Sequence, residues 1–505
     1  MSTGAFALPP RWVSQAVVYQ IFPDRFRRGA GASVDPLGSH RIEPWGSPPS
    51  ARGFQGGDLH GVIDALDHLQ DLGVTCLSLN PIFSSAANHR YHTYDYLQVD
   101  PLLGGNSAFD ALVSALKRRG MRLVLDGVFN HCGRGFWAFH HLLENGASSP
   151  YADWFAVDNW PLNPYPRPSA RGAARRAGYH CWWNDAALPK FNHANPAVRD
   201  YLLAVGEHWL QRGIDGWRLD VADEVPTDFW VQFRQRVRQT NPEAWIIGEV
   251  WGDARPWLQG DQFDGVMNYR FGWSTLGWVA DGQLKPGHGR RSMPYGNCDG
   301  GSYTQVLQET LGWYRDAVNL AQLNLLDSHD VPRALHMLQG DVKALQLALV
   351  LLFCLPGAPC LYYGTEVGLH GGEEPGCREA FPWDGPSGWR ADLRAFIASL
   401  AALRHAHGAL CSGTLQLAVL KGSEGDQGLL LQRQGHGTAI DASITVVINR
   451  NRRAPLRLDH PRLRQSLPGE APWAVVWPAE HRAGPMPQQL APQSAVVLQR
   501  RPAQP

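Results

Sequence analysis

The sequence predicts an α/β protein built on a parallel (β/α)8 TIM barrel, with an inserted lobe after its third strand and a C-terminal β-sandwich. Two patterns predict the barrel. Eight short apolar runs alternate with amphipathic stretches, which is typical of parallel strands covered by helices. Three of these runs end at an acidic residue, and the carboxyl ends of barrel strands are where such folds hold their functional side chains.

The eight expected strands are short and mostly apolar, and helical patterns separate them. The strands are Ala16–Ile21, Thr75–Leu79, Arg122–Leu125, Gly216–Leu219, Trp245–Ile247, Gly265–Asn268, Leu323–Leu326 and Pro359–Tyr363. The clearest helical patterns are Val62–Leu72, Phe109–Arg119, Ala197–Arg212 and Phe229–Gln239. The apolar run Ala344–Tyr363 contains Pro356, Gly357 and Pro359, so it predicts a buried helix, a turn and a strand, not a membrane span.

Two segments depart from this alternation. Residues 132–195 are aromatic and rich in proline, and a structureless loop of that length is unusual in a compact domain. We therefore expect a small lobe over the barrel mouth. Beyond Gly408 the pattern changes to short strand-like runs, namely Leu429–Gln432, Ile444–Ile448, Ala474–Trp477 and Ala495–Leu498. The expected domains are residues 1–131 and 196–407 for the barrel, 132–195 for the lobe and 408–505 for the sandwich, ending in a frayed tail, Arg500–Pro505.

Composition excludes several classes of function. The 46 basic and 46 acidic residues balance, so no global field favours nucleic acid or an anionic membrane. The first ten residues lack the basic and apolar regions of a signal peptide, which predicts a cytoplasmic protein. The eight cysteines form no CxxC pair, and Cys76, Cys354 and Cys360 lie in or beside apolar runs. We expect these three to be reduced core residues, while a disulfide elsewhere stays open.

The sequence also predicts no transition metal and no nucleotide cofactor. Its 20 histidines form no HExxH motif and no Cys/His ligand framework. No glycine-rich phosphate loop lies between a strand and a helix.

The three strand-end acids are Asp220, Glu249 and Asp330. Carboxylates from different strands that meet in one pocket are the groups that break a glycosidic bond. Arg218 is two residues before Asp220, hence on the same face of the strand, and its charge is expected to lower the pKa of Asp220. Glu249 is followed by Val250 and Trp251, and a less polar site would raise its pKa, as a general acid requires.

Four segments carry a resemblance to a known family. They are Asp126–His131 (DGVFNH), Gly216–Glu224 (GWRLDVADE), Gly248–Trp251 (GEVW) and Leu325–Asp330 (LLDSHD). In order and position this set resembles the α-amylase superfamily, glycoside hydrolase family 13. The resemblance implies that Asp220 is the nucleophile, Glu249 the acid/base and Asp330 the transition-state stabiliser. It further implies that Asp126 supports Arg218, and that sugar ligands include His131, Arg218 and His329.

Further segments are similar to neopullulanases, cyclomaltodextrinases and maltogenic amylases. The loop Asn88–Tyr96 implies an aromatic sugar platform at Tyr91, and Leu188–Asn192 (LPKFN) adds Lys190 at the mouth. Glu224 is expected on the leaving-group side, with Trp251 and Arg378 as further substrate-binding candidates. Only about ten residues precede Trp12, so we expect the extra N-terminal domain of this subgroup to be missing, and its dimerisation is not implied.

Relatives often place a calcium ligand cluster after the Pro-Asp-Arg-Phe segment. Here that place reads Arg27–Gly31 (RRGAG), which offers two positive charges and no side-chain oxygen, whereas calcium takes six to eight oxygens. We expect no calcium there, while a cation held by Asn130 and carbonyls of the lobe stays open.

The sequence thus predicts a retaining hydrolase of α-glucans such as maltodextrins, cyclodextrins or pullulan. A transglycosylase with the same intermediate is the first alternative. A catalytically silent glucan-binding protein is the second, and the intact acidic trio disfavours it. The sequence leaves open the linkage preference, whether the substrate is linear or cyclic, whether the action is exo or endo, and the oligomeric state.

Overall fold

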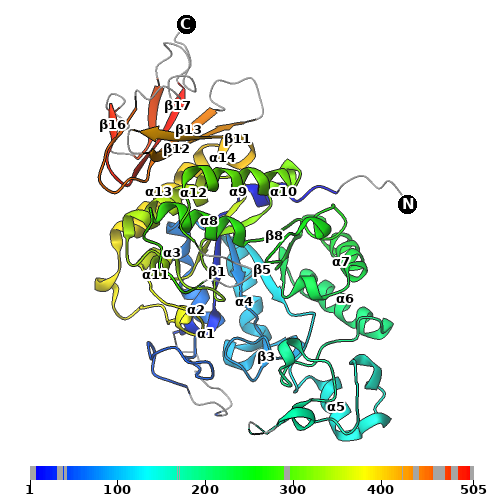
Figure 1. Cartoon of the computed structure of the whole chain (residues 1–505). Coiled ribbons are helices and arrows are strands. Elements are labelled where there is room, and N and C mark those ends of the chain that lie inside the picture. The colour runs from blue at the N-terminus through cyan, green and yellow to red at the C-terminus, as the bar shows by residue number, and fades with distance from the viewer. Residues whose placement is uncertain are drawn as a thin grey trace.

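The structure is a computed structural model that describes residues 7–30, 38, 42–167, 169, 171–288, 296–422, 425–435, 443–458, 473–478 and 487–500. Its centre is a closed barrel of eight parallel strands (Figure 1). In barrel order these are β1 (Val18–Ile21), β2 (Cys76–Leu79), β5 (Arg122–Gly127), β6 (Gly216–Leu219), β7 (Trp245–Gly248), β8 (Gly265–Asn268), β9 (Leu323–Leu325) and β10 (Ala358–Tyr362), which pairs with β1. All eight predicted barrel strands are confirmed.

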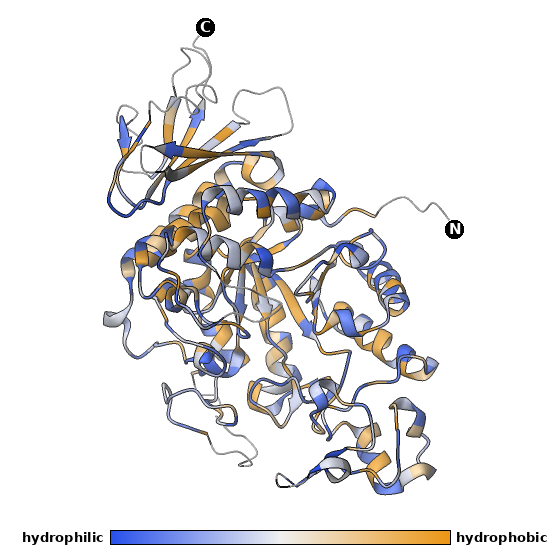
Figure 2. Cartoon of the chain, in the orientation of Figure 1, coloured by the Kyte–Doolittle hydropathy of each residue, from blue (hydrophilic) through white to orange (hydrophobic). Residues whose placement is uncertain are grey.

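Burial on both faces explains why the barrel strands read as continuous apolar runs. Every residue of β1, β2, β6, β7 and β10 is buried. Apolar residues concentrate on the central strands, whereas the outer helices carry both hydrophilic and apolar residues (Figure 2). The main outer helices are α4 (Gly105–Arg118), α6 (Pro196–Gln211), α7 (Thr227–Thr240), α8 (Tyr269–Val279), α9 (Gly300–Gly312), α12 (Val342–Cys354) and α13 (Ala391–Ala406).

Two details near β2 differ from the prediction. The helix expected over Val62–Leu72 is two short helices, α2 (Leu59–Asp64) and α3 (Leu66–Asp71), which meet at Ala65. After β2 the chain forms a hairpin that was not predicted, with strands β3 (Phe83–Ser85) and β4 (Thr93–Val99). The loop of this hairpin carries Tyr91 to the carboxyl ends of the barrel strands.

The segment Ala344–Tyr363 forms the predicted helix, turn and strand, as α12 and β10. The turn depends on Gly357, whose φ is +121°. A Cβ atom there would lie 2.5 Å from the side-chain nitrogen of Asn324, so only glycine fits. Within the described part of the chain, no helix combines the length and the apolar character that a membrane crossing requires. All eight cysteines are unpaired, and Cys76, Cys354 and Cys360 are buried as predicted.

Residues 132–195 leave the barrel after β5 and return at α6. They contain α5 (Trp137–Asn145) and several short 3-10 turns. The ring of Phe139 packs edge-on against Phe155 and Tyr179, in an aromatic group that is continuous with the core of the barrel. It projects from the barrel on the side away from the C-terminal sheet (Figure 1).

The C-terminal part contains a five-stranded antiparallel sheet and a two-stranded sheet. The larger sheet has the order β11 (Thr414–Gly422), β12 (Gly425–Gln434), β13 (Ser443–Asn449), β17 (Ser494–Arg500) and β15 (Trp473–Trp477), and the smaller pairs β14 (Leu456–Arg457) with β16 (Gln489–Leu490). The four predicted strand runs lie in β12, β13, β15 and β17. Arg433 of β12 donates to the carbonyl oxygen of Cys354 at 2.8 Å, which fastens this sheet to the end of α12. Residues 501–505 of the expected tail lie outside the described residues.

Candidate active site

The three strand-end acids line one cavity of about 500 Å³. Asp220 directly follows β6, Glu249 directly follows β7, and Asp330 lies in the loop after β9. Parallel strands of a barrel end on the same face, which brings these side chains together. The other lining residues are His89, Tyr91, His92, Trp182, Trp183, Asp185, Leu188, Val221, Asp223, Glu224, Trp251, Glu374 and Arg378.

The buried guanidinium of Arg218 joins the acids. Its Nη1 donates to Oδ1 of Asp126 at 2.8 Å and to Oδ1 of Asp220 at 2.7 Å. Its Nη2 lies 2.9 Å from Oε1 of Glu249 and 4.0 Å from Oδ2 of Asp330. Asp220 is therefore held through one oxygen. Its Oδ2 is buried and has no hydrogen-bond partner among the described residues.

Burial, and not Arg218, decides the protonation of these acids. It raises the pKa of Asp220 well above its usual value, and the charge of Arg218 opposes this without cancelling it. The expected net lowering of the pKa of Asp220 is therefore wrong, because burial, together with the charges of Glu249 and Asp126, raises this pKa. Burial also raises the pKa of Glu249, as predicted, and raises that of Asp126 to about 6. The cluster thus holds protons at a pH where isolated carboxyl groups are ionised.

Glu249 is positioned by two further donors. The backbone N–H of Val221 donates to its Oε2 at 3.0 Å, and the indole N–H of Trp251 donates to its Oε1 at 3.1 Å. Trp251 is itself stacked on Tyr269, with ring centroids 4.1 Å apart. Val221 has a φ of +46°, a left-handed conformation that is costly for a β-branched residue. Nothing in the sequence pattern pointed to Val221, because its contribution comes from the backbone.

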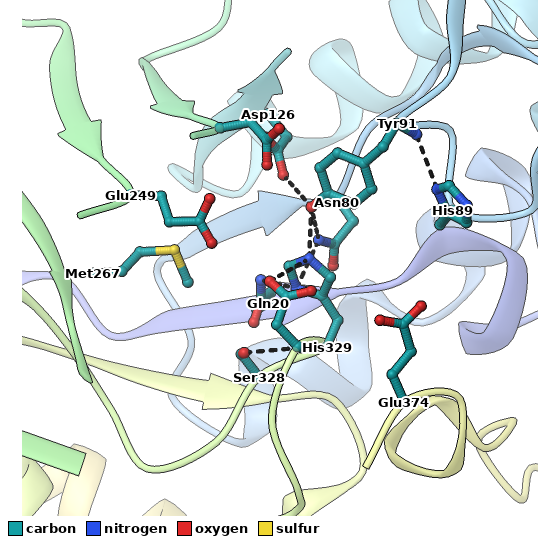
Figure 3. A network of polar contacts seen from close by, with 12 residues as sticks. Gln20, Asn80, His89, Tyr91, Asp126, Glu249, Met267, Ser328, His329 and Glu374 are labelled. Atoms are coloured by element: carbon teal, nitrogen blue, oxygen red, sulfur yellow. Dashed lines mark hydrogen bonds and ion pairs between the residues drawn. The ribbon is translucent and has the colours of Figure 1, made fainter. Parts of the chain in front are cut away.

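His329 lies in the middle of a polar network, and the side chains of Gln20, Asn80 and Tyr91 all contact its ring (Figure 3). The amide nitrogens of Gln20 and Asn80 lie 3.2 and 3.0 Å from Nδ1 of His329. An amide N–H can only donate, so Nδ1 accepts and the ring proton is on Nε2. That Nε2 lies 2.6 Å from the hydroxyl of Tyr91 and 3.0 Å from Oδ2 of Asp330.

The ring of His329 is neutral, because burial lowers its pKa well below the usual value. The Tyr91 hydroxyl donates onward to Oδ2 of Asp126 at 2.9 Å, which links this network to Arg218. Gln20 and Asn80 were missed in the sequence. Asn80 directly follows β2, so the rule that singled out the acids could have found it.

The other predicted substrate-binding residues differ in how closely they approach the cavity. His131 does not line the cavity, because it is fully buried and Trp182 stacks on it with ring centroids 5.0 Å apart. Arg378 donates to the carbonyl oxygen of His329 at 2.9 Å, and its Nη2 lies 3.4 Å from Oδ1 of Asp330. Lys190 forms an ion pair of 2.9 Å with Glu224, which lines the cavity.

At the place where the family resemblance suggested a calcium cluster, the carbonyl oxygens are bound by an arginine. The guanidinium of Arg28 donates to the carbonyl oxygens of Gln55 at 2.8 Å and Glu43 at 2.9 Å. These carbonyls are the kind of ligand a cation would use, and the positive charge there opposes a second cation. No cluster of three or more His, Cys, Asp or Glu suited to a metal ion occurs among the described residues. The residues at this place do not fit a calcium ion.

Known proteins are similar to this chain in sequence and architecture. Residues 20–381 match the family described as "Alpha amylase, catalytic domain". A cyclomaltodextrinase of Geobacillus thermopakistaniensis is 40% identical over 455 residues, which span 89% of this chain and 72% of that protein. The cyclic α-maltosyl-(1→6)-maltose hydrolase of Arthrobacter globiformis, solved with that sugar, superposes with a TM-score of 0.83 at 35% identity, covering 97% of this chain and all of the other.

A debranching enzyme of Nostoc punctiforme also superposes with a TM-score of 0.83, at 41% identity over 98% of this chain and 99% of its own. The family match covers more than half of the chain, and these relatives extend over most of the rest. The chain therefore belongs to the alpha-amylase family of glycoside hydrolases.

Proposed function

We propose that this enzyme hydrolyses α-glucosidic bonds with retention of configuration, through a covalent glycosyl-enzyme intermediate. The observation that carries the proposal is the single guanidinium of Arg218, which contacts both Asp220 and Glu249. Two carboxyl groups that share one guanidinium fit the close spacing of roughly 5 Å that retaining glycosidases use.

The reaction assigns a task to each oxygen. Asp220 attacks the anomeric carbon in its ionised form, which the charge of Arg218 favours against burial. The attacking atom is Oδ2, because Oδ1 is held by Arg218 while Oδ2 has no partner in the described structure. Glu249 gives its proton to the leaving glycosidic oxygen, which its raised pKa favours. Glu249 then takes a proton from water, the water oxygen attacks the same carbon, and the bond to Asp220 breaks.

Asp330 and His329 act on the sugar at the point of cleavage. Asp330 lines the cavity, and its Oδ2 lies 3.0 Å from Nε2 of His329. A negative carboxylate there stabilises the positive charge that develops on the sugar ring in the transition state. Asp126 and Tyr91 keep Arg218 and His329 in place, so they act as positioning residues.

The substrates we propose are maltodextrins and cyclic or branched α-glucans. The support is the set of relatives, whose names refer to cyclomaltodextrin, cyclic maltosyl-maltose and debranching. The test measures products from soluble starch, pullulan, β-cyclodextrin, panose and maltotriose, with Asp220→Asn as the blank, and the anomeric configuration of the first product by NMR. We expect α-products from at least one of these. First products in the β-configuration contradict the retaining mechanism, and products from Asp220→Asn equal to those of the wild type contradict the assignment of the nucleophile.

A further inference from the structure

A stack of three aromatic rings begins at the buried His131 and ends in an exposed indole that lines the cavity. Trp182 stacks on the buried ring of His131, with centroids 5.0 Å apart and planes within 7°. Trp183 stacks on Trp182, with centroids 4.7 Å apart and planes within 14°. Both indoles line the cavity that holds Asp220 and Glu249. Trp183 is 73% exposed, so one of its faces is covered by Trp182 and most of the rest meets solvent.

The backbone under this indole is strained. Trp183 has a φ of +49° and Asn184 a φ of +56°. Left-handed backbone is tolerated by asparagine but is unfavourable for a large aromatic residue. An indole that is 73% exposed also gains little from the hydrophobic effect. Folding therefore explains neither the conformation nor the residue type, and strain of this kind clusters at ligand sites.

We propose that Trp183 is a stacking platform for a glucosyl unit of the substrate that lies outside the two units joined by the cleaved bond. This inference rests on the proposed α-glucan substrate and adds a residue that selects for longer chains. The apolar C–H face of a glucose ring fits the flat face of an indole. Asp185 lines the same cavity two residues further on, so its carboxylate can accept from hydroxyl groups at the rim of that sugar.

Other exposed tryptophans provide matched controls. Trp160 is 43% exposed and lies in the same inserted segment, but it does not line the cavity. Loss of an exposed indole at Trp160 should therefore not change the use of long substrates. This separates stacking at the mouth from a general effect of removing a surface tryptophan.

The first experiment compares wild type, Trp183→Asn, Trp183→Tyr and Trp160→Asn on maltotriose and maltoheptaose. We expect the ratio of kcat/KM for maltoheptaose to that for maltotriose to fall by up to about tenfold in Trp183→Asn, the loss expected when one aromatic stacking contact is removed. Trp183→Tyr should recover most of this loss, because it keeps an aromatic face. Trp160→Asn should keep the wild-type ratio. An unchanged ratio in Trp183→Asn overturns the proposal.

The second experiment separates binding from stability and from catalysis. Asparagine adopts left-handed backbone readily, so Trp183→Asn should unfold at the same or a higher temperature than wild type. A lower unfolding temperature with an unchanged ratio would show that Trp183 has a structural role only. Calorimetric titration of maltoheptaose into Asp220→Asn, with and without Trp183→Asn, should show an increase of about tenfold in Kd. If the wild type cleaves no α-glucan but this difference in Kd appears, the platform stands and the proposed function fails.

Discussion

Replacing Asp126 by asparagine should stabilise the fold at alkaline pH and leave it nearly unchanged at acid pH. Burial raises the pKa of Asp126 from 3.8 to about 6, so the folded state binds this proton more tightly than the unfolded chain does. The resulting stabilisation is fully present below pH 3.8 and is lost as the pH rises through about 6. A pKa difference of this size corresponds to roughly 3 kcal/mol, at about 1.4 kcal/mol per pH unit.

Asparagine resembles the protonated carboxyl group in shape and cannot ionise, so Asp126→Asn should escape this loss. The assay is thermal or denaturant unfolding of both proteins at pH 4 and pH 8. We expect the free energy of unfolding of Asp126→Asn, relative to wild type, to rise by up to roughly 3 kcal/mol between the two pH values. Activity should fall at both pH values, because the amide nitrogen that replaces Oδ2 cannot accept from the Tyr91 hydroxyl.

Asp110 supplies a control for this experiment. It forms an ion pair of 2.6 Å with Arg212, but its side chain is 61% exposed. An exposed pair contributes about 0–1 kcal/mol, so Asp110→Asn should show no gain at pH 8. If Asp126→Asn is less stable than wild type at pH 8, its attraction to Arg218 outweighs its desolvation, and the reasoning about the whole carboxyl cluster is refuted.

Two further predictions concern the active site, and a third concerns the place occupied by Arg28. Glu249→Gln should lower kcat for maltooligosaccharides by a factor of roughly 10²–10⁴. For p-nitrophenyl glycosides the glycosylation step should slow far less, because their leaving group needs no proton. An equal loss on both substrates in burst-phase kinetics argues against the role of Glu249 as the acid. Asn80→Asp should move the proton of His329 onto Nδ1, since a carboxylate only accepts, and nitrogen NMR of the labelled ring reports it; an unchanged tautomer counts against the network. Dialysis against EDTA should leave the unfolding temperature unchanged, because Arg28 already binds the carbonyl oxygens of Glu43 and Gln55. A drop that calcium restores would reveal a cation site elsewhere.

The barrel strands could be predicted from the sequence because each strand is marked by a pattern of neighbouring residues. A parallel strand buried on both faces is a continuous apolar run, and the residue after it points to the mouth. That rule predicts that Asp220 and Glu249 lie in one cavity, as they do. The rule failed at the β3–β4 hairpin, because β4 alternates buried residues with half-buried and exposed ones such as Gln98 and carries no such run.

The parts of the site that escaped prediction depend on conformation and on many-body electrostatics. Val221 contributes a backbone N–H group aimed by a left-handed φ, and no side-chain pattern encodes that. Trp183 matters because it is exposed in a strained loop, whereas a tryptophan in a sequence is expected to be buried. The pKa of Asp220 has the opposite direction to the prediction because a pairwise argument with Arg218 leaves out burial and the other acids.

These failures share a cause that also explains the chemistry. One guanidinium, Arg218, contacts three carboxyl groups inside the barrel, so its single positive charge cannot keep all of them ionised in a buried site. The cluster must retain protons, and hydrolysis needs a retained proton at Glu249. The fixed contact between Arg218 and Oδ1 of Asp220 leaves only Oδ2 for attack. A lysine at position 218 would keep the positive charge but lose the forked guanidinium that reaches both acids at once. Arg218→Lys should therefore remain folded yet lose most of its kcat. A variant with near wild-type kcat would show that the charge alone is sufficient.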